Sequence, residues 1–258
     1  MDNLKITTFQ AYLFWENVER NLNNITLKLS GIREKTDLII LPEMFSTGFS
    51  MEAAKLAEPM NGKTMQWMQK IAVLYDCVIT GSIIIKDDEK YYNRLIWMRQ
   101  DGTYEYYDKR HLFAMGKEHQ TYTPGDKKLI VELKGWKICP MICYDLRFPV
   151  WLRNVELEYD LLILVANWPE KRIAHWRALL TARAIENQAY VIGVNRVGHD
   201  GNEVYHSGDS TCIDPVGNSV YYKRDEEDLY TFTILAEEVK KVRKALPFLK
   251  DADQFEIL

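Results

Sequence analysis

The sequence predicts an α/β fold in which β-sheets are covered by helices. Three observations lead to this prediction. Short apolar runs typical of buried strands alternate with amphipathic helical stripes over the first 85 residues, the middle of the chain carries short strands separated by turn residues, and the alternation of strands and helices resumes after residue 143.

The elements of the first third follow from the spacing of their apolar residues. Residues 4–13 are expected to form an opening strand, and apolar residues spaced three and four apart predict a helix over 18–32. A short apolar run predicts a buried strand over 37–41. A second amphipathic stripe predicts a helix over 65–75, and a third strand is expected over 77–85.

The middle of the chain is predicted to be rich in strands. Residues 91–98 and 103–109 flank Gln-Asp-Gly, which favours a hairpin, and residues 128–133 are expected to pair with 136–143 across Lys-Gly. The remaining elements, in chain order, are a strand at 160–167, a helix at 171–188, a strand at 189–197, a hairpin around 215–218, a strand at 229–235 and a helix at 236–246.

The chain reads as one domain over residues 1–258, because it has no internal repeat, low-complexity run or linker. Its last segment, about residues 247–258, is too short for a domain and is expected to be an arm that packs on a partner subunit.

Composition and charge favour a small-molecule partner. The 33 Lys and Arg against 37 Asp and Glu give a net charge of -4, which provides no basic field for nucleic acid. The apolar runs, such as residues 161–168, are shorter than the roughly 20 residues of a membrane-spanning helix. No signal peptide is visible, so a cytoplasmic location is expected. The four cysteines lack zinc-site spacing; most are expected to be buried thiols, and neither a metal nor an organic cofactor is predicted.

Three chemically capable side chains follow predicted strands: Glu43, Lys109 and Cys143. Ligands gather beyond the carboxyl ends of strands in α/β folds, which makes these side chains candidates for one site. A helix cap or surface carboxylate is the plainer interpretation of Glu43, and a solvated face that of Lys109. A thiol with an ordinary pKa of about 8.5 needs a base or a positive neighbour to act as a nucleophile, and the other two side chains supply both.

Cys143 is also expected to begin a helix, because Phe148, Trp151, Leu152 and Val155 recur at helical spacing. A thiol at such a strand-to-helix turn would be ionised by the helix dipole, and the backbone N–H groups there would hold an oxyanion.

These segments resemble those of a known family. "LPEMFSTGF", "YDKRHLF" and "ICYDLRFP" resemble the three signature segments of the nitrilase superfamily, and "LVANWP", "RALLTARAIENQAYVIGVNRVG" and "GDS" are similar to its omega-amidase branch. The resemblance implies a four-layer αββα sandwich, a homodimer, and hydrolysis of the terminal amide of 2-oxo dicarboxylic acid monoamides. It also implies a catalytic set of Glu43, Lys109 and Cys143, with Glu118 as a second glutamate that orients Lys109.

In the expected mechanism Glu43 takes the thiol proton, Cys143 attacks the amide carbon, and Lys109 and the Tyr144 backbone N–H hold the oxyanion. The free carboxylate of such a substrate needs a cation in the pocket. Further candidates for substrate binding are Arg172, followed by the weaker Lys117 and His119, and Trp168. Arg147 is instead expected to brace the Cys143 turn through an ion pair with Glu118 or Asp145.

Four alternatives stay open or are disfavoured. A cysteine phosphatase is disfavoured because only three residues separate Cys143 from Arg147 and the loop has no glycine. A papain-like hydrolase is disfavoured because no histidine has a local signature as the base. A C–N hydrolase acting on N-carbamoyl compounds or aliphatic amides, and a non-catalytic dimeric scaffold, stay open.

Overall fold

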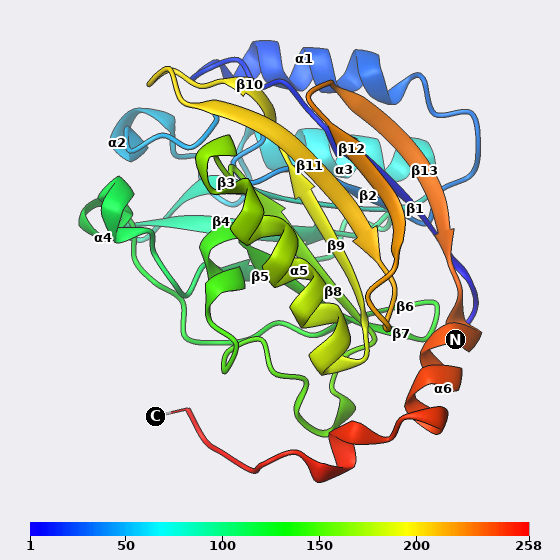
Figure 1. The fold of residues 1–258 in the computed structure, drawn as a ribbon. Helices are drawn as coiled ribbons and strands as arrows, with labels where there is room; N and C mark the ends of the chain where they lie inside the picture. The colour runs from blue at the N-terminus through cyan, green and yellow to red at the C-terminus, as the bar shows by residue number, and fades with distance from the viewer. Residues whose placement is uncertain (258) are drawn as a thin grey trace.

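The fold consists of two facing β-sheets with helices on their outer sides, as the computed structural model of the chain shows (Figure 1). It describes residues 1–257. Helices α1 (Val18–Leu29) and α3 (Lys63–Tyr75) cover the first sheet, and α5 (Ile173–Asn187) covers the second. The predicted α/β sandwich of four layers is therefore confirmed.

The first sheet has six strands in the order β13-β1-β2-β3-β4-β5. The pairs β1–β2 and β2–β3 are parallel, and the remaining neighbours are antiparallel. The strands are β1 (Leu4–Gln10), β2 (Leu38–Ile40), β3 (Val78–Asp87), β4 (Lys90–Met98), β5 (Tyr104–Asp108) and β13 (Asp228–Ile234).

The second sheet follows the order β10-β11-β9-β8-β7-β6, and β12 pairs with β11. Its centre, β7–β8–β9, is parallel. The strands are β6 (Val131–Leu133), β7 (Trp136–Ile142), β8 (Leu161–Ala166), β9 (Tyr190–Asn195), β10 (Val197–His199), β11 (Tyr205–Ile213) and β12 (Ser219–Arg224).

The two larger hydrophobic cores hold these layers together. One lies between the sheets, where Trp97 of β4 and Trp136 of β7 are fully buried, and extends beneath α5. The other packs the apolar stripes of α1 and α3 on the first sheet and includes Ile25, Met68 and Ile39. A strand whose two faces are both buried reads as a continuous apolar run, which is why residues 161–166 are all apolar.

The prediction of a helix after Cys143 is wrong. A 3₁₀ turn spans Cys143–Arg147, and the next helical segment is another 3₁₀ turn at Val155–Leu157. Pro149 explains the break, because a proline disfavours helical backbone in the residue before it, and Phe148 has φ -111° and ψ 87°. Two of the apolar residues that suggested a helix, Trp151 and Leu152, are instead buried in the core between the sheets.

Short elements at the chain's turns went unpredicted from the apolar pattern. They are α2 (Ala53–Leu56), α4 (Glu118–Thr121) and β10. The last helix, α6 (Ala236–Ala245), is followed by a 3₁₀ turn at Phe248–Asp251 and an irregular segment that carries exposed Phe255 and Ile257. Packing of this arm on a partner subunit stays a prediction, and its last residue, Leu258, lies outside the described residues. Within residues 1–257, no helix is both long and apolar enough to span a membrane.

Candidate active site

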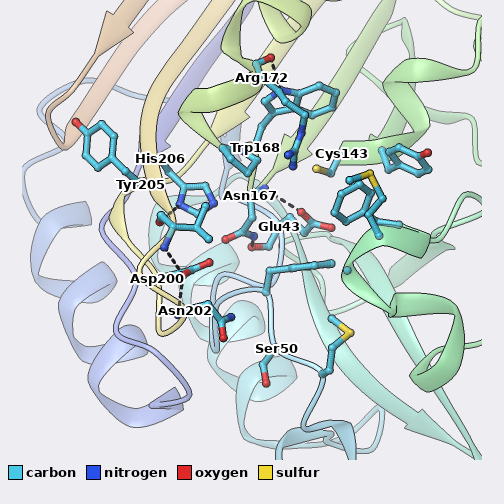
Figure 2. A pocket seen from close by; sticks show the side chains of 18 of the residues that line it. Glu43, Ser50, Cys143, Asn167, Trp168, Arg172, Asp200, Asn202, Tyr205 and His206 are labelled. Carbon is cyan, nitrogen blue, oxygen red and sulfur yellow. Dashed lines mark hydrogen bonds between the residues drawn. The ribbon is translucent and has the colours of Figure 1, made fainter.

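A cavity of about 820 Å³ opens where several strands end (Figure 2). Its lining includes residues that directly follow β7, β8 and β5, namely Cys143, Asn167 and Lys109, together with Glu43 just beyond β2. The structure thus brings the three side chains predicted from strand ends into one hollow.

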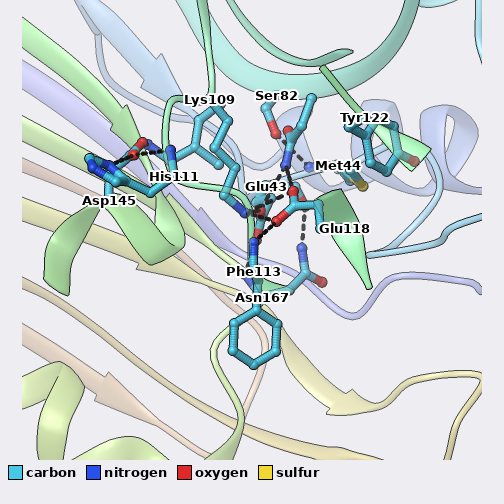
Figure 3. A network of polar contacts seen from close by, with 12 residues as sticks. Glu43, Met44, Ser82, Lys109, His111, Phe113, Glu118, Tyr122, Asp145 and Asn167 are labelled. Carbon is cyan, nitrogen blue, oxygen red and sulfur yellow. Dashed lines mark hydrogen bonds and ion pairs between the residues drawn. The ribbon is translucent and has the colours of Figure 1, made fainter. Parts of the chain in front are cut away.

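Glu43 is fully buried, and each oxygen of its carboxylate has its own partners (Figure 3). Oε1 accepts hydrogen bonds from Lys109 Nζ at 2.8 Å and from Asn93 Nδ2 at 2.9 Å. Oε2 accepts the backbone N–H of Asn167 at 2.8 Å. The next residue, Met44, has a left-handed backbone with φ 44°, and its N–H donates to Ser82 Oγ. The hydrogen bond to Ser82 holds this strained turn in place, and the Glu43 carboxylate lies in the wall of the cavity.

Lys109 lies between two carboxylates. Its Nζ is 2.8 Å from Glu43 Oε1 and 2.9 Å from Glu118 Oε2, and the side chain is 1% exposed. Burial alone would lower the pKa of Lys109, but the charges of Glu118 and Glu43 outweigh burial and raise it. Lys109 is therefore an ammonium ion at neutral pH.

Glu118 stands behind Lys109 and completes the charged group. Both of its oxygens accept from Lys109 Nζ, and Oε2 also accepts the Phe113 N–H at 2.6 Å. Burial raises the pKa of Glu118, Lys109 opposes this, and the charge of Glu43 adds to it. The position agrees with the role that the family resemblance implies for Glu118, which is to orient Lys109.

Cys143 occupies a strained turn directly after β7. Its φ of 43° is left-handed, and the turn is held by Asp145, whose Oδ2 accepts the Ile142 N–H at 3.1 Å. Burial, followed by the nearby charge of Glu43, raises the pKa of the thiol well above its ordinary value, while Lys109 acts in the opposite direction. The Asn167 backbone N–H lowers the pKa of this thiol, as expected of backbone groups here, but burial and Glu43 outweigh it. The resting thiol is protonated, so nucleophilic attack requires a base.

Asp145 also ties the Lys109 segment to the Cys143 segment. Its Oδ1 accepts the His111 N–H at 3.0 Å and lies 2.8 Å from His111 Nδ1, and its Oδ2 accepts from Tyr107 Oη at 2.9 Å. Two segments that are far apart in the sequence are therefore held in fixed register beside the cavity (Figure 3).

Three of the predicted substrate-binding residues line the outer part of the cavity: Tyr144, Trp168 and Arg172. Trp168 Nε1 donates to the Arg172 carbonyl at 2.9 Å, and the Arg172 guanidinium points toward Cys143 (Figure 2). Lys117 and His119 are exposed and do not line the cavity, because α4 directs Glu118 inward and turns its neighbours outward. The structure therefore does not place these two predicted substrate-binding residues at the cavity.

Arg147 does not form the predicted ion pair with Glu118 or Asp145. Its Nη2 lies 3.2 Å from His175 Nδ1, and its guanidinium stacks 4.6 Å from the ring of Trp168. The two acidic groups are already saturated by other donors, which leaves the Arg147 side chain free to line the cavity.

Arg147 and Arg172 form an unneutralised cationic pair. Within residues 1–257, neither makes an ion pair with a carboxylate. Burial lowers the pKa of Arg172, and repulsion from Arg147 lowers it further. Two guanidinium groups on the wall of one cavity indicate a binding place for an anionic group.

Two functional positions were missed from the sequence. Asn167 holds Glu43 twice, because its side chain donates to the Glu43 carbonyl at 2.6 Å in addition to the backbone bond. It directly follows an apolar strand, so the rule that selected Glu43, Lys109 and Cys143 would also have selected it. The sequence indicates Asn93 less clearly, because the only sign of a functional role is a single amide side chain inside an otherwise largely apolar strand.

Cys77, Cys139 and Cys212 are buried free thiols, as expected, and they do not line the cavity. Across residues 1–257, no three His, Cys, Asp or Glu side chains are grouped closely enough to hold a metal ion.

Comparisons with known proteins agree with this site. The family model described as Carbon-nitrogen hydrolase matches residues 5–244. The chain is 44% identical over 262 residues to the omega-amidase YafV of Escherichia coli strain K12, covering all of both proteins. It is 29% identical over 250 residues to a 2-oxoglutaramate amidase of Bacillus subtilis, covering 95% of this chain and 96% of that protein. A solved CN-hydrolase superfamily protein from Xanthomonas campestris, with an arsenic adduct in its active site, superposes with a TM-score of 0.97 at 42% identity over all of both chains. The chain belongs to the carbon-nitrogen hydrolase family, as its three signature segments predict.

Proposed function

We propose that the chain is an omega-amidase that hydrolyses the terminal amide of 2-oxo dicarboxylic acid monoamides such as 2-oxoglutaramate and 2-oxosuccinamate. One observation carries the proposal: a thiol, a carboxylate and an ammonium ion share a cavity whose outer wall presents two unneutralised guanidinium groups. The names of relatives that match over nearly the whole chain, an omega-amidase and a 2-oxoglutaramate amidase, support the same activity.

Acylation begins with the protonated thiol. Glu43 Oε2 accepts the thiol proton, and Cys143 Sγ forms a bond to the amide carbon. The carbonyl oxygen takes negative charge, which the Lys109 ammonium and the Tyr144 backbone N–H stabilise. Each such donor lowers the barrier by about 3 kcal/mol. Glu43 returns its proton to the nitrogen, the C–N bond breaks, and ammonia leaves a thioester on Cys143.

Deacylation uses the same carboxylate. Glu43 removes a proton from a water molecule, the resulting hydroxide adds to the thioester carbon, and the oxyanion forms again beside Lys109. The C–S bond then breaks, the sulfur recovers the proton held by Glu43, and the new carboxylic acid group loses its proton to solvent as the dicarboxylate product leaves. In the resting site Glu118 and Glu43 raise the pKa of Lys109, and while Glu43 holds a proton, Glu118 and the oxyanion are the negative charges beside the ammonium ion.

The cationic pair supplies substrate selection. A 2-oxo acid carries a carboxylate at the end opposite its amide, and a guanidinium holds a carboxylate through two parallel hydrogen bonds. Arg172 and Arg147 lie on the cavity wall that also holds Cys143, so a substrate anchored there presents its far end to the thiol. An aliphatic amide has no carboxylate for these guanidinium groups to bind. A scaffold protein would have no need of a carboxylate-binding place.

A substrate panel tests the proposal against its alternatives. Ammonia release is measured from 2-oxoglutaramate, 2-oxosuccinamate, a carbamoyl amino acid and an aliphatic amide. We expect kcat/KM to be highest for the two 2-oxo monoamides. A preference for the carbamoyl compound or the aliphatic amide would favour the alternative C–N hydrolase, and the absence of turnover together with a thiol that resists alkylation would favour a scaffold.

Two further predictions from the sequence accompany this function. We propose that the protein is a homodimer and that it works in the cytoplasm on a free small molecule. Light scattering of the purified protein at several concentrations measures the first, and fractionation of cells that express it measures the second. A monomer at micromolar concentration would contradict the dimer.

A further inference from the structure

Asn93 is a buried amide that contacts both carboxylates of the active site. It lies on β4 and is 1% exposed. Its Nδ2 donates to Glu43 Oε1 at 2.9 Å and to Glu118 Oε1 at 3.1 Å. Among the residues that the structure describes, the only other side chain bonded to both carboxylates is Lys109.

Asn93 also fixes the backbone of Lys109. The Lys109 N–H donates to the Asn93 carbonyl oxygen at 3.0 Å, just beyond the pairing of β4 with β5. The neighbouring side chain, Arg94, faces the other side of the sheet and pairs with Asp108. One residue therefore contacts three members of the charged group, through its amide and through its main chain.

The orientation of the Asn93 amide is set by its donors. Its Oδ1 is buried and has no hydrogen-bond partner. An unpaired buried acceptor is unfavourable, yet the flipped amide would place this oxygen against two carboxylates, which is worse. The position therefore requires a neutral hydrogen-bond donor.

The contacts of Asn93 decide which oxygen of Glu43 is free to act. Lys109 and Asn93 together occupy Oε1, whereas Oε2 accepts only the Asn167 backbone N–H. Without the amide, the two carboxylates would lose their shared neutral donor, and Glu43 would be held only by Lys109 at Oε1 and by the Asn167 N–H at Oε2. The oxygen that receives the thiol proton would then be held less firmly.

We propose that Asn93 is a positioning residue for the hydrolysis, which holds Glu43 and Glu118 around Lys109 and directs Glu43 Oε2 to the thiol of Cys143. Asn93 does not line the cavity, and it contacts Glu43 at Oε1 and not at Oε2, the oxygen that takes the thiol proton in the proposed mechanism. The inference rests on the proposed function in that Glu43 serves as the base, but it holds for any amide that the enzyme cleaves.

The test compares Asn93→Leu, which keeps the size and removes the donor, with a matched control. Asn154→Leu removes another buried asparagine, whose Nδ2 donates to the Tyr159 and Asn187 carbonyls away from the cavity. We expect kcat of Asn93→Leu to fall on the order of 10- to 100-fold, with KM changed less than about threefold. Rates are divided by the concentration of Cys143 that iodoacetamide titrates, so that loss of folded protein does not count.

The pH profile separates positioning from a merely structural role. The titratable groups that face Glu43 are Lys109, Glu118, Cys143 and Tyr122. Loss of a donor to the two carboxylates favours their protonated forms, so the acid limb of kcat/KM should move to higher pH by about one unit. In Asn93→Asp the carboxyl group can donate only when protonated, so its activity relative to Asn93→Leu should rise as the pH falls.

Two results would overturn the inference: a wild-type kcat and pH profile in Asn93→Leu, or losses no greater than those of Asn154→Leu. An aliphatic amide is measured in parallel. If the wild type cleaves that amide but not 2-oxoglutaramate, the proposed substrate class fails. The kcat values of Asn93→Leu and Asn154→Leu are then compared with the aliphatic amide as substrate.

Discussion

The Nζ atom of Lys109 lies 2.8 Å from Oε1 of Glu43, and both side chains are almost completely buried. Glu118 binds the same ammonium ion from behind at 2.9 Å. Two negative charges therefore share one positive charge at the buried inner wall of the cavity. This balance determines how the base, the oxyanion donor and the thiol respond to mutation.

Replacing Lys109 with methionine removes the charge and keeps most of the volume. Because two buried carboxylates would then face each other, we expect the free energy of unfolding to fall by about 3–5 kcal/mol and kcat by about 100- to 1000-fold. Lys35→Met, which removes an exposed lysine, is the control and should change stability by less than about 0.5 kcal/mol. Urea denaturation measures the free energy of unfolding of both variants. Undiminished stability in Lys109→Met would contradict the charge balance described above.

Glu43→Gln should separate turnover from thiol reactivity. Loss of the base should lower kcat by about 100- to 10,000-fold. The charge of Glu43 raises the pKa of Cys143, so a neutral glutamine should lower that pKa and increase the thiolate fraction at pH 7. Iodoacetamide should therefore alkylate the variant at least as fast as the wild type. Parallel losses of alkylation and turnover would show that Glu43 only shapes the site.

Removal of the cationic pair should change specificity more than chemistry. For Arg172→Leu and Arg147→Leu, we expect KM for 2-oxoglutaramate to rise about 10- to 100-fold, while kcat/KM for an aliphatic amide stays within about threefold. Arg224→Leu is the control, because Arg224 pairs with Glu170 at the cavity rim and is partly exposed. If KM for 2-oxoglutaramate is unchanged in both variants, the carboxylate binds elsewhere.

His206 makes folding stability depend on pH. Burial, followed by repulsion from Arg196, lowers the pKa of His206 from 6.5 to about 4, and its ring lies 3.0 Å from the Val204 carbonyl. The neutral ring is favoured in the folded state, so its stabilising effect is complete above pH 6.5 and is lost as the pH falls toward 4.

This shift corresponds to about 3 kcal/mol between pH 7.5 and pH 4. Between pH 7.5 and pH 4, the loss of stability of His206→Gln should be smaller than that of the wild type by about this amount. His119→Gln, at an exposed histidine, should keep the wild-type dependence. Chemical denaturation at several pH values measures the slopes, and equal slopes in wild type and His206→Gln would contradict the prediction.

Most strands and long helices could be predicted from the sequence, because burial of one or both faces leaves a regular apolar pattern. The stripe of α1 and the apolar run of β8 are examples. The helix expected after Cys143 failed because the apolar spacing arises from an irregular segment that buries the adjacent residues Trp151 and Leu152 and leaves Val155 exposed. Pro149 was the local signal against it.

The candidate catalytic residues could be located from strand ends and from the family resemblance, whereas their electrostatics could not. The pKa of Cys143 depends on burial and on Glu43, which lies 100 positions earlier in the sequence. Arg147 likewise has no carboxylate partner because other donors already bind Asp145 and Glu118. Such properties arise only when distant segments meet.

The most direct test of the account follows the product of one reaction in three proteins. Ammonia release from 2-oxoglutaramate is measured for wild type, for Cys143→Ala, and for Cys77→Ala as a control at a buried thiol outside the cavity. We predict that wild type and Cys77→Ala release ammonia, that Cys143→Ala releases none above background, and that acid-quenched wild type carries the acyl mass on the peptide with Cys143. Ammonia release by Cys143→Ala at the wild-type rate would contradict the account.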